Sequence, residues 1–447
     1  MGNYGGDIII CSIVLVSLYV VYFSTNIIKS LVGNGEDILS SKEYYSWIIR
    51  FLLNFAGYAT VLLPGYLIYK YVRISKYLQR KGKGCLSRLV HSCFVGSGDQ
   101  GLLDSPHYSQ VPTNNGQPRT FLQDTFILVH CFLGLQASYL TWGYLQEKIM
   151  TQEYVDELGN KGHFKDSQFL VFINRVLAVI ISSVCLMVIR QPAHTIPLYK
   201  YAFCSFSNVL SSWCQYEALK YVSFPTQVLA KASKIIPVMI MGKIVSRSKY
   251  EYYEYVTAVF ISIGMMMFML GSTDHESDGT TTFSGVMLLG TYMTLDSFTS
   301  NWQNALFKDY GVSTIQMMCA VNLFSVLLTA TSLFQQEGLV YSLSFMTTYP
   351  QFTFDCILIS IFSTTGQLYI YYTISNFGAV TFIIMMTIRQ GFAILLSCIT
   401  YHHYITPLGI IGIIIVFLAV FLRIYCNNRL RAIKKRRAEA ISIKNKS

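Results

Sequence analysis

Residues 228–239 read VLAKASKIIPVM and place Lys231 and Lys234 in a run whose other side chains are apolar or small. A charged side chain near the centre of a bilayer costs about 2.5 to 3.5 kcal/mol on insertion scales, so it usually faces a water-filled cavity or a partner of opposite charge. Residues three apart share one face of a helix, with about 4.5 Å of rise between them. Two ammonium groups can therefore reach one multiply charged anion. We also expect Pro237 to kink the helix beside them.

The chain around this run has the composition of a polytopic membrane protein. Of its 447 residues, 53% are hydrophobic and 13% are charged, whereas soluble proteins have about a quarter charged residues. A helix needs about 20 mostly apolar residues to cross a bilayer. The first span has no basic segment before it and no cleavage site after it, so we expect it to be retained. Twelve spans are predicted, at 7–28, 46–70, 123–146, 168–190, 200–221, 222–244, 252–271, 283–305, 313–334, 352–373, 379–401 and 406–425.

The formal net charge of +11 comes largely from two segments rather than from one binding face. The segment 71–120 and the tail from Arg423 onward together hold sixteen of the 34 lysines and arginines. Basic residues next to membrane spans favour the cytosolic side. Ten spans separate the two segments, and an even number puts both on that side, so we expect both termini in the cytosol. The basic tail is typical of membrane orientation and attraction to anionic lipids, not of nucleic-acid binding.

The ten spans after residue 120 divide into two sets of five. Because each set has an odd number of spans, the two sets have opposite orientations in the membrane and form an inverted repeat. When residues from 219 are aligned with residues from 374, Thr226 and Thr381 are the one identity, but Lys234 falls opposite Arg389. We therefore predict an all-α membrane protein. Its parts are two N-terminal transmembrane helices (1–70), a basic cytosolic loop (71–120), repeat 1 (121–272), repeat 2 (283–425) and a basic cytosolic tail (426–447).

More cations than anions are predicted at the middle of the membrane. Asp296 is the clear anion there, and Glu217 lies nearer the far side. Either lysine alone could pair with one of these carboxylates, and that interpretation stays open. Even if both carboxylates pair with a cation, two cations are left without one, so the surplus indicates an anionic ligand. The four predicted cations are Arg175, Lys231, Lys234 and Arg389.

The spans 200–221 and 352–373 are rich in polar and aromatic side chains, which can hydrogen-bond hydroxyls or base edges and stack on a ring. The same residue types also serve ordinary helix packing. Beside the cations they indicate an anionic substrate that contains a ring, such as a nucleotide. Rings that could stack are Trp213, Tyr369 and Tyr372. The candidate substrate-binding residues are Lys231, Lys234, Arg389, Asn208, Ser212, Gln215, Tyr216, Thr364, Thr365, Gln367, Tyr371 and Arg175.

Three stretches resemble the nucleotide-sugar transporter family: LQASYLTWGYLQEKIMT at 135–151, SNVLSSWCQYEALKYVSFPTQVLAKASKIIPVMIMGKIVSRSKYEYYEY at 207–255, and STTGQLYIYYTISNFGAVTFIIMMTIRQ at 363–390. Within the family they are most similar to the Golgi transporters of adenosine 3′-phospho 5′-phosphosulfate (PAPS). The resemblance implies a ten-helix drug/metabolite-transporter fold of two inverted five-helix repeats. It also implies that Lys231, Lys234 and Arg389 hold the phosphates. The two spans before residue 71 lie outside the shared fold.

The function implied by the resemblance is an antiport of PAPS into the Golgi lumen for sulfation, in exchange for an adenosine nucleotide such as adenosine 3′,5′-bisphosphate. Antiport of a nucleotide sugar in the same fold is the alternative. A channel or scaffold is a third interpretation. A membrane-embedded enzyme is disfavoured, because the sequence has no carboxylate pair at a useful spacing, no nucleophile motif and no histidine cluster.

No cofactor is expected, and no metal site, because Cys85, His91 and Cys93 are one ligand short of a structural zinc set. The expected partners are a small anionic nucleotide and the lipid bilayer, with no nucleic acid. A homo-oligomer is left open. The tail ends in KNKS, which lacks the dilysine retrieval pattern and so favours the Golgi over the endoplasmic reticulum.

Overall fold

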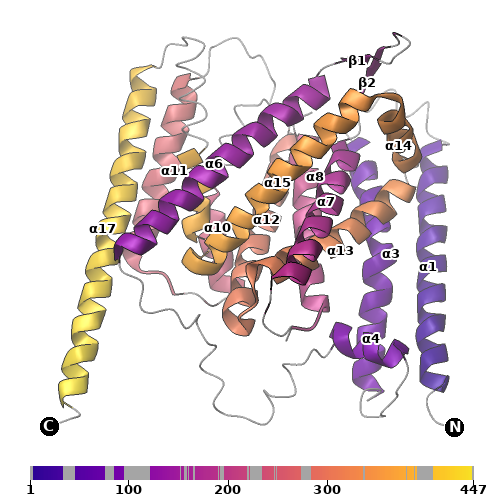
Figure 1. Ribbon diagram of the computed structural model, residues 1–447, viewed down its shortest axis with the longest axis horizontal. Helices are drawn as coiled ribbons and strands as arrows, with labels where there is room; N and C mark the ends of the chain where they lie inside the picture. The colour runs from indigo at the N-terminus through magenta and orange to yellow at the C-terminus, as the bar shows by residue number, and fades with distance from the viewer. Residues whose placement is uncertain are drawn as a thin grey trace. The chain divides into compact units, whose positions relative to one another are not determined.

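In the computed structural model, the part of the chain that is described is built almost entirely of helices (Figure 1). The elements are α1 (Tyr4–Gly33), α3 (Ser46–Ile74), α4 (Cys85–Phe94), α6 (Phe121–Thr151), β1 (Glu153–Val155), β2 (Lys161–His163), α7 (Ser167–Val188), α8 (Tyr199–Ala218), α10 (Ile235–Val245), α11 (Tyr252–Ser272), α12 (Phe283–Tyr310), α13 (Thr314–Gln335), α14 (Gly338–Thr348), α15 (Pro350–Phe377) and α17 (Pro407–Lys444). Residues 380–386 and 388–389 are also helical.

The residues that the structure describes are 4–33, 46–75, 85–94, 121–151, 153–155, 159, 161–164, 167–189, 191, 196–218, 221, 234–245, 247, 249–272, 283–335, 338–378, 380–386, 388–389 and 406–444. Several predictions fall wholly or partly outside this set. They are the position of Lys231, residues 222–233 of the span predicted at 222–244, most of the span predicted at 379–401 and most of the loop predicted at 71–120.

Five of the described helices are long and apolar enough to cross a membrane, and they coincide with five of the twelve predicted spans. Helices α12 and α15 are each 28 residues long but carry many serine, threonine, asparagine and glutamine side chains, which lower their hydropathy. The other predicted spans stay predictions. The five helices are Gly6–Ile27 in α1, Phe51–Ile74 in α3, Leu122–Leu145 in α6, Gln168–Val188 in α7 and Thr314–Phe334 in α13.

The chain divides into two compact units. Unit 1 holds Met1–Tyr216 and Trp302–Asn376, and unit 2 holds Glu217–Asn301 and Phe377–Ser447. The second boundary falls inside α12, so the first part of that helix belongs to unit 2 and its last turns belong to unit 1. Each unit has its own packing and its own polar cluster.

In unit 1 the two N-terminal helices are packed against the rest of the unit. Helix α1 lies along α3, α3 packs against α13, and α13 packs against α7. A polar chain crosses these helices: Gln168 Nε2 donates to Ser332 Oγ over 2.9 Å, and Ser332 Oγ donates to Asn54 Oδ1 over 2.8 Å. Both Ser332 and Asn54 are buried. Because buried polar groups are costly without partners, this chain fixes how α3 is seated on α13 and α7.

One end of unit 1 is capped by an aromatic cluster. Strands β1 and β2 form an antiparallel hairpin in which Tyr154 lies opposite Gly162. The ring of Phe164, just after β2, lies 4.6 Å from that of Phe352 on α15, measured between centroids. Phe345 on α14 packs 4.9 Å from Phe352. These contacts join the hairpin, α14 and the start of α15 into one apolar core.

A buried ion pair lies inside this cap. Lys148 Nζ on α6 is 2.8 Å from Asp355 Oδ2 on α15, and the Tyr154 hydroxyl donates to the same oxygen over 3.0 Å. Burial, with a smaller contribution from the Asp355 carboxylate, raises the pKa of the Tyr154 hydroxyl above its usual value. Tyr154 therefore stays a neutral donor, and Asp355 is held by two partners from different elements.

Part of the segment predicted as a basic loop, 71–120, is the short helix α4. Val90 of α4 packs with Val72 of α3 and Ile10 of α1. The ring of Phe94 lies 6.2 Å from that of Tyr199 at the start of α8. Helix α4 is thus docked on three helices of unit 1.

In unit 2, α11 packs along α17. A Cβ at Gly264 of α11 would lie 2.8 Å from the carbonyl oxygen of Gly412, so the absence of a side chain lets the two helices approach closely. Arg423 Nη2 is 3.3 Å from Glu254 Oε1 across the same pair of helices. Helix α17 continues to Lys444, so the basic segment after residue 425 extends the last predicted span as a helix.

Candidate functional site

Unit 1 holds a cation that is bound by neutral partners. Arg175 on α7 donates from Nη2 to Oδ1 of Asn208 on α8 over 2.8 Å, and from Nη1 to Oδ1 of Asn322 on α13 over 3.2 Å. Asn322 Nδ2 in turn donates to Oε1 of Gln367 on α15 over 2.9 Å. We call these four residues the Arg175 cluster. Four helices therefore converge on one guanidinium.

Among the described residues, no carboxylate pairs with Arg175. Its hydrogen-bond acceptors there are the two amide oxygens of Asn208 and Asn322. A guanidinium has five N–H donors, and these bonds use two of them. Asn322 is fully buried and Gln367 nearly so. In such surroundings an unmatched positive charge is costly and attracts an anion. The structure thus places three of the predicted site residues, Arg175, Asn208 and Gln367, in one cluster.

Two further groups lie beside the Arg175 cluster. Tyr371 is buried and close enough to Arg175 to interact with it electrostatically. Cys204 also lies in electrostatic range of Arg175, and Gln303 donates to its sulfur over 3.2 Å. Tyr371 is thus the aromatic candidate that the structure places next to the cation.

Several predicted hydroxyl residues make ordinary bonds within their own helices. Ser212 Oγ donates to the Asn208 carbonyl over 2.9 Å. Thr364 Oγ1 donates to Ser360, and Thr365 Oγ1 to Ile361, in the same way. Their hydroxyl protons therefore satisfy helix carbonyls, which is the packing role that the sequence left open. Gln215 is half-buried on α8, and the Tyr216 side chain lies outside the described part of the chain.

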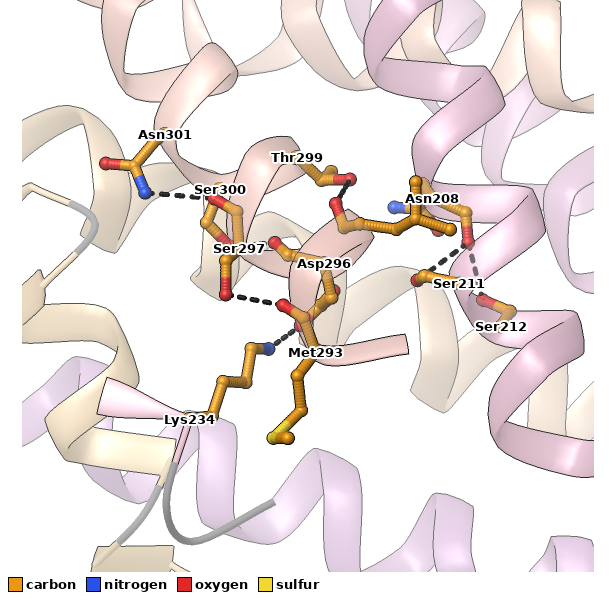
Figure 2. A network of polar contacts seen from close by, with 11 residues as sticks. Asn208, Ser211, Ser212, Lys234, Met293, Asp296, Ser297, Thr299, Ser300 and Asn301 are labelled. Carbon is orange, nitrogen blue, oxygen red and sulfur yellow. Dashed lines mark hydrogen bonds and ion pairs between the residues drawn. The ribbon is translucent and has the colours of Figure 1, made fainter. Parts of the chain in front are cut away.

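Unit 2 holds the second polar site. Lys234, just before α10, forms an ion pair with Asp296 on α12 (Figure 2). The Lys234 side chain is 11% exposed and that of Asp296 is 24% exposed. The Lys234 Nζ also lies 5.8 Å from the centroid of the Tyr292 ring, one helical turn before Asp296. The pairing with Asp296 that the sequence left open for Lys234 is thus confirmed, and the predicted surplus of two cations already allowed for it.

Helix α10 is fixed to α12 close to this pair. Asn301 Nδ2 donates to the Val238 carbonyl over 2.8 Å and to the Ser297 carbonyl over 2.9 Å. In the described part of the chain α10 begins at Ile235, so Pro237 falls in its first turn. The N–H groups of a first turn have no partner within the helix, so proline is tolerated there. Residues 222–233 lie outside the described part of the chain, so the kink expected at Pro237 stays a prediction.

Arg389 lies in the helical residues 388–389 and interacts electrostatically with Tyr292. Tyr292 is also the ring that Lys234 approaches. The two cations that the repeat alignment set opposite each other therefore share a neighbour in unit 2. We call Lys234, Asp296, Tyr292 and Arg389 the Lys234 site.

Sequence reasoning missed three of the polar residues that matter here. Asn322 lies in the predicted span 313–334 and Asp355 in the predicted span 352–373, so an amide and a carboxylate within predicted spans were the available signal. Gln303 gave no comparable signal, because it lies near the end of a polar helix.

Comparisons with known proteins match the chain to transporters. A model described as the UAA transporter family matches residues 127–427. The chain is 50% identical over 448 residues to adenosine 3′-phospho 5′-phosphosulfate transporter 1 of Drosophila melanogaster, with 97% of this chain and 96% of the relative covered. It is 48% identical over 406 residues to the Homo sapiens protein of that name, with 90% and 93% covered.

A plant relative is more distant. UDP-galactose/UDP-glucose transporter 5B of Arabidopsis thaliana is 37% identical over 302 residues, with 66% of this chain and 87% of the relative covered. These relatives are transporters, so the enzyme interpretation is excluded. On the match over residues 127–427 and the identity to relatives of similar length, the chain belongs to the UAA transporter family.

Proposed function

We propose that the protein carries PAPS from the cytosol into the Golgi lumen in exchange for an adenosine nucleotide such as adenosine 3′,5′-bisphosphate. The observation that carries the proposal is the Arg175 guanidinium, whose recorded partners among the described residues are neutral amides. The choice of PAPS over other anions is supported by two relatives named for it, at 50% and 48% identity.

The proposed fold has ten helices in two inverted five-helix repeats, after two additional helices. Helix packing supports this proposal, because equivalent members of the two predicted repeats lie together within a unit. The second spans, α7 and α13, pack against each other in unit 1, and the fifth spans, α11 and α17, do so in unit 2. A pseudo-two-fold axis relates repeats in transporters of this kind.

The charges of PAPS suit the cations of the chain. A phosphate monoester carries about −1.5 to −2 at neutral pH, and PAPS adds a phosphosulfate to its 3′-phosphate. We propose that Lys231, Lys234 and Arg389 hold phosphate groups and that the Arg175 cluster takes part in substrate binding. In this proposal Gln215, Tyr216 and Tyr371 contact the remainder of the nucleotide, and Ser212, Thr364 and Thr365 line it through their oxygen lone pairs.

Exchange follows from charge compensation. A transporter with an unmatched cation at mid-membrane reorients slowly, because moving that charge through low dielectric is costly. A bound nucleotide, whether PAPS or adenosine 3′,5′-bisphosphate, neutralises the charge in both directions. We propose cytosolic N- and C-termini, which the basic residues near the spans support.

The test is uptake of labelled PAPS by the purified protein in proteoliposomes. We expect uptake to need internal adenosine 3′,5′-bisphosphate and to be inhibited by that nucleotide added outside. Equal uptake with and without internal nucleotide would contradict exchange.

Antiport of a nucleotide sugar is the second candidate, favoured by the plant relative named for UDP-galactose and UDP-glucose. The same assay separates the two. External UDP-galactose and UDP-glucose should leave PAPS uptake unchanged if the proposal is right. Inhibition by them, with transport of the labelled UDP-sugars, would favour the alternative.

A further inference from the structure

The carboxylate of Asp296 is held by a single partner among the described residues, the ammonium of Lys234. The neighbouring hydroxyls of α12 are used elsewhere, because Ser297 Oγ donates to the Met293 carbonyl and Ser300 Oγ donates to the backbone carbonyl of Asp296 (Figure 2). A carboxylate can accept about four hydrogen bonds. With 24% of its side chain exposed, Asp296 can leave Lys234 and still be hydrated.

The ammonium of Lys234 is paired with the Asp296 carboxylate, and the Lys234 side chain is 11% exposed. The Tyr292 ring, 5.8 Å away, adds a weak attraction. A phosphate that binds Lys234 therefore meets the negative charge of Asp296 and competes with it for the ammonium. With about twice the charge, a phosphate is attracted more strongly than the carboxylate. The displaced Asp296 then stays beside the phosphate and repels it.

We propose that Asp296 is an internal counter-ion that competes with the substrate phosphate for Lys234. It weakens binding so that the substrate is released, and it neutralises Lys234 when no substrate is bound. Asp296 is thus a positioning residue that sets the balance between tight binding and turnover. This inference rests on the proposed function, because it requires Lys234 to bind a phosphate of the substrate.

Competition has a direct consequence for affinity. The apparent dissociation constant is raised by a factor of one plus the equilibrium constant for forming the internal pair, because the paired state is unable to bind. Exposed ion pairs contribute little free energy, whereas removal of one partner from a buried ion pair has a larger effect. For this largely buried pair we expect a change of about tenfold, which corresponds to ~1.4 kcal/mol.

The experiment compares Asp296→Asn with the unaltered protein in proteoliposomes. We expect the half-saturating PAPS concentration to fall about tenfold and the maximal exchange rate to fall as well, because release becomes slower. Asp296→Glu, which keeps the charge, should restore both values toward those of the unaltered protein.

Glu254→Gln is the matched control, because it removes the same charge from another carboxylate of unit 2, the partner of Arg423. It should lower thermal stability and leave the half-saturating concentration unchanged. If Asp296→Asn is not recovered as a monodisperse protein, Asp296→Ser gives the same comparison.

The outcomes separate this inference from the proposed function. If the unaltered protein exchanges PAPS and needs Lys234, but Asp296→Asn has an unchanged or raised half-saturating concentration, the inference alone is overturned. If the unaltered protein neither binds nor exchanges PAPS, both fail. Tighter binding in Asp296→Asn with slower exchange, and no such effect in Glu254→Gln, supports it.

Discussion

Asn301 on α12 donates a 2.8 Å hydrogen bond to the backbone carbonyl of Val238 on α10. The bond lies one turn after Lys234 along the chain and just over one turn after Asp296 on α12. It holds the two helices at the spacing that the ion pair of Lys234 and Asp296 requires. The close approach depends on Gly242, where a Cβ would overlap Tyr250 Oη and Asn301 Oδ1.

We therefore expect Gly242→Ala to destabilise the protein by about 1–3 kcal/mol, as overpacking does in a well-packed core. The displaced Asn301 should also lower exchange activity. Gly290→Ala on α12 is the control, because nothing lies within 4 Å of a Cβ at that position and alanine is the better helix former. The measurement is the midpoint of heat-induced loss of monodisperse protein. Equal midpoints for the two variants would show that the close approach is not needed.

Removal of Arg175 should abolish most of the exchange activity. Arg175→Ala takes away the cation and leaves the amides of Asn208 and Asn322 without their donor, so we expect at least a tenfold loss, or about 1.4 kcal/mol. Arg175→Lys keeps the charge, but an ammonium does not reproduce the planar fork that reaches two amides, so it should rescue only in part. Arg429→Ala, at an exposed position of α17, should keep full activity.

An Arg175→Ala protein that exchanges PAPS at the normal rate and affinity would remove the Arg175 cluster from the substrate site. Loss of activity together with loss of monodisperse protein would point to a structural role instead.

The ion pair of Lys148 and Asp355 should matter for stability rather than for transport. Asp355 is only 3% exposed, so Lys148→Met leaves a buried carboxylate without its cation. We expect a loss of about 3 kcal/mol, and a smaller loss in the double variant Lys148→Met/Asp355→Leu, because the buried charge is then gone. The thermal midpoints of Lys148→Met, Asp355→Leu and the double variant measure the coupling between the two residues. Additive losses would mean that the pair has no coupling.

Asn54 provides a test of whether the N-terminal helices are part of the fold. Asn54→Ala removes the acceptor of the Ser332 hydroxyl in a buried place, so we expect a loss of stability of about 1–3 kcal/mol. Thr60→Ala on the same helix is the control, because among the described residues the Thr60 hydroxyl donates to the Gly57 carbonyl of its own helix and to no other group. If both variants unfold at the same temperature as the unaltered protein, α3 is not seated through Asn54.

The sequence predicted the membrane class well, because apolar runs of about 20 residues need no tertiary information. Five predicted spans coincide with helices of that kind, and the ends of α7 and α13 fall close to the predicted limits. The contacts of polar side chains were harder to predict. Asp355 and Asn322 each lie within a predicted span, and their partners are 207 and 147 residues away in the sequence, a separation that no local pattern reports.

The charge count was correct in kind but incomplete. Sequence reasoning identified Asp296 as the candidate partner of a lysine, and the structure assigns it to Lys234. It could not show that Arg175 rests on neutral amides, since that depends on how α7, α8 and α13 meet. The hydroxyl residues Ser212 and Thr364 were ambiguous for a physical reason, because a helix carbonyl and a substrate compete for the same proton.

The central claim is that mid-membrane cations bind the phosphates of a nucleotide that is exchanged. The most direct measurement is PAPS exchange by purified protein with Lys231, Lys234 and Arg389 each changed to alanine. We predict that the unaltered protein exchanges PAPS for adenosine 3′,5′-bisphosphate and that each variant, still folded and monodisperse, loses at least tenfold in exchange at low substrate concentration, or about 1.4 kcal/mol. Retention of normal exchange by all three variants would contradict the claim.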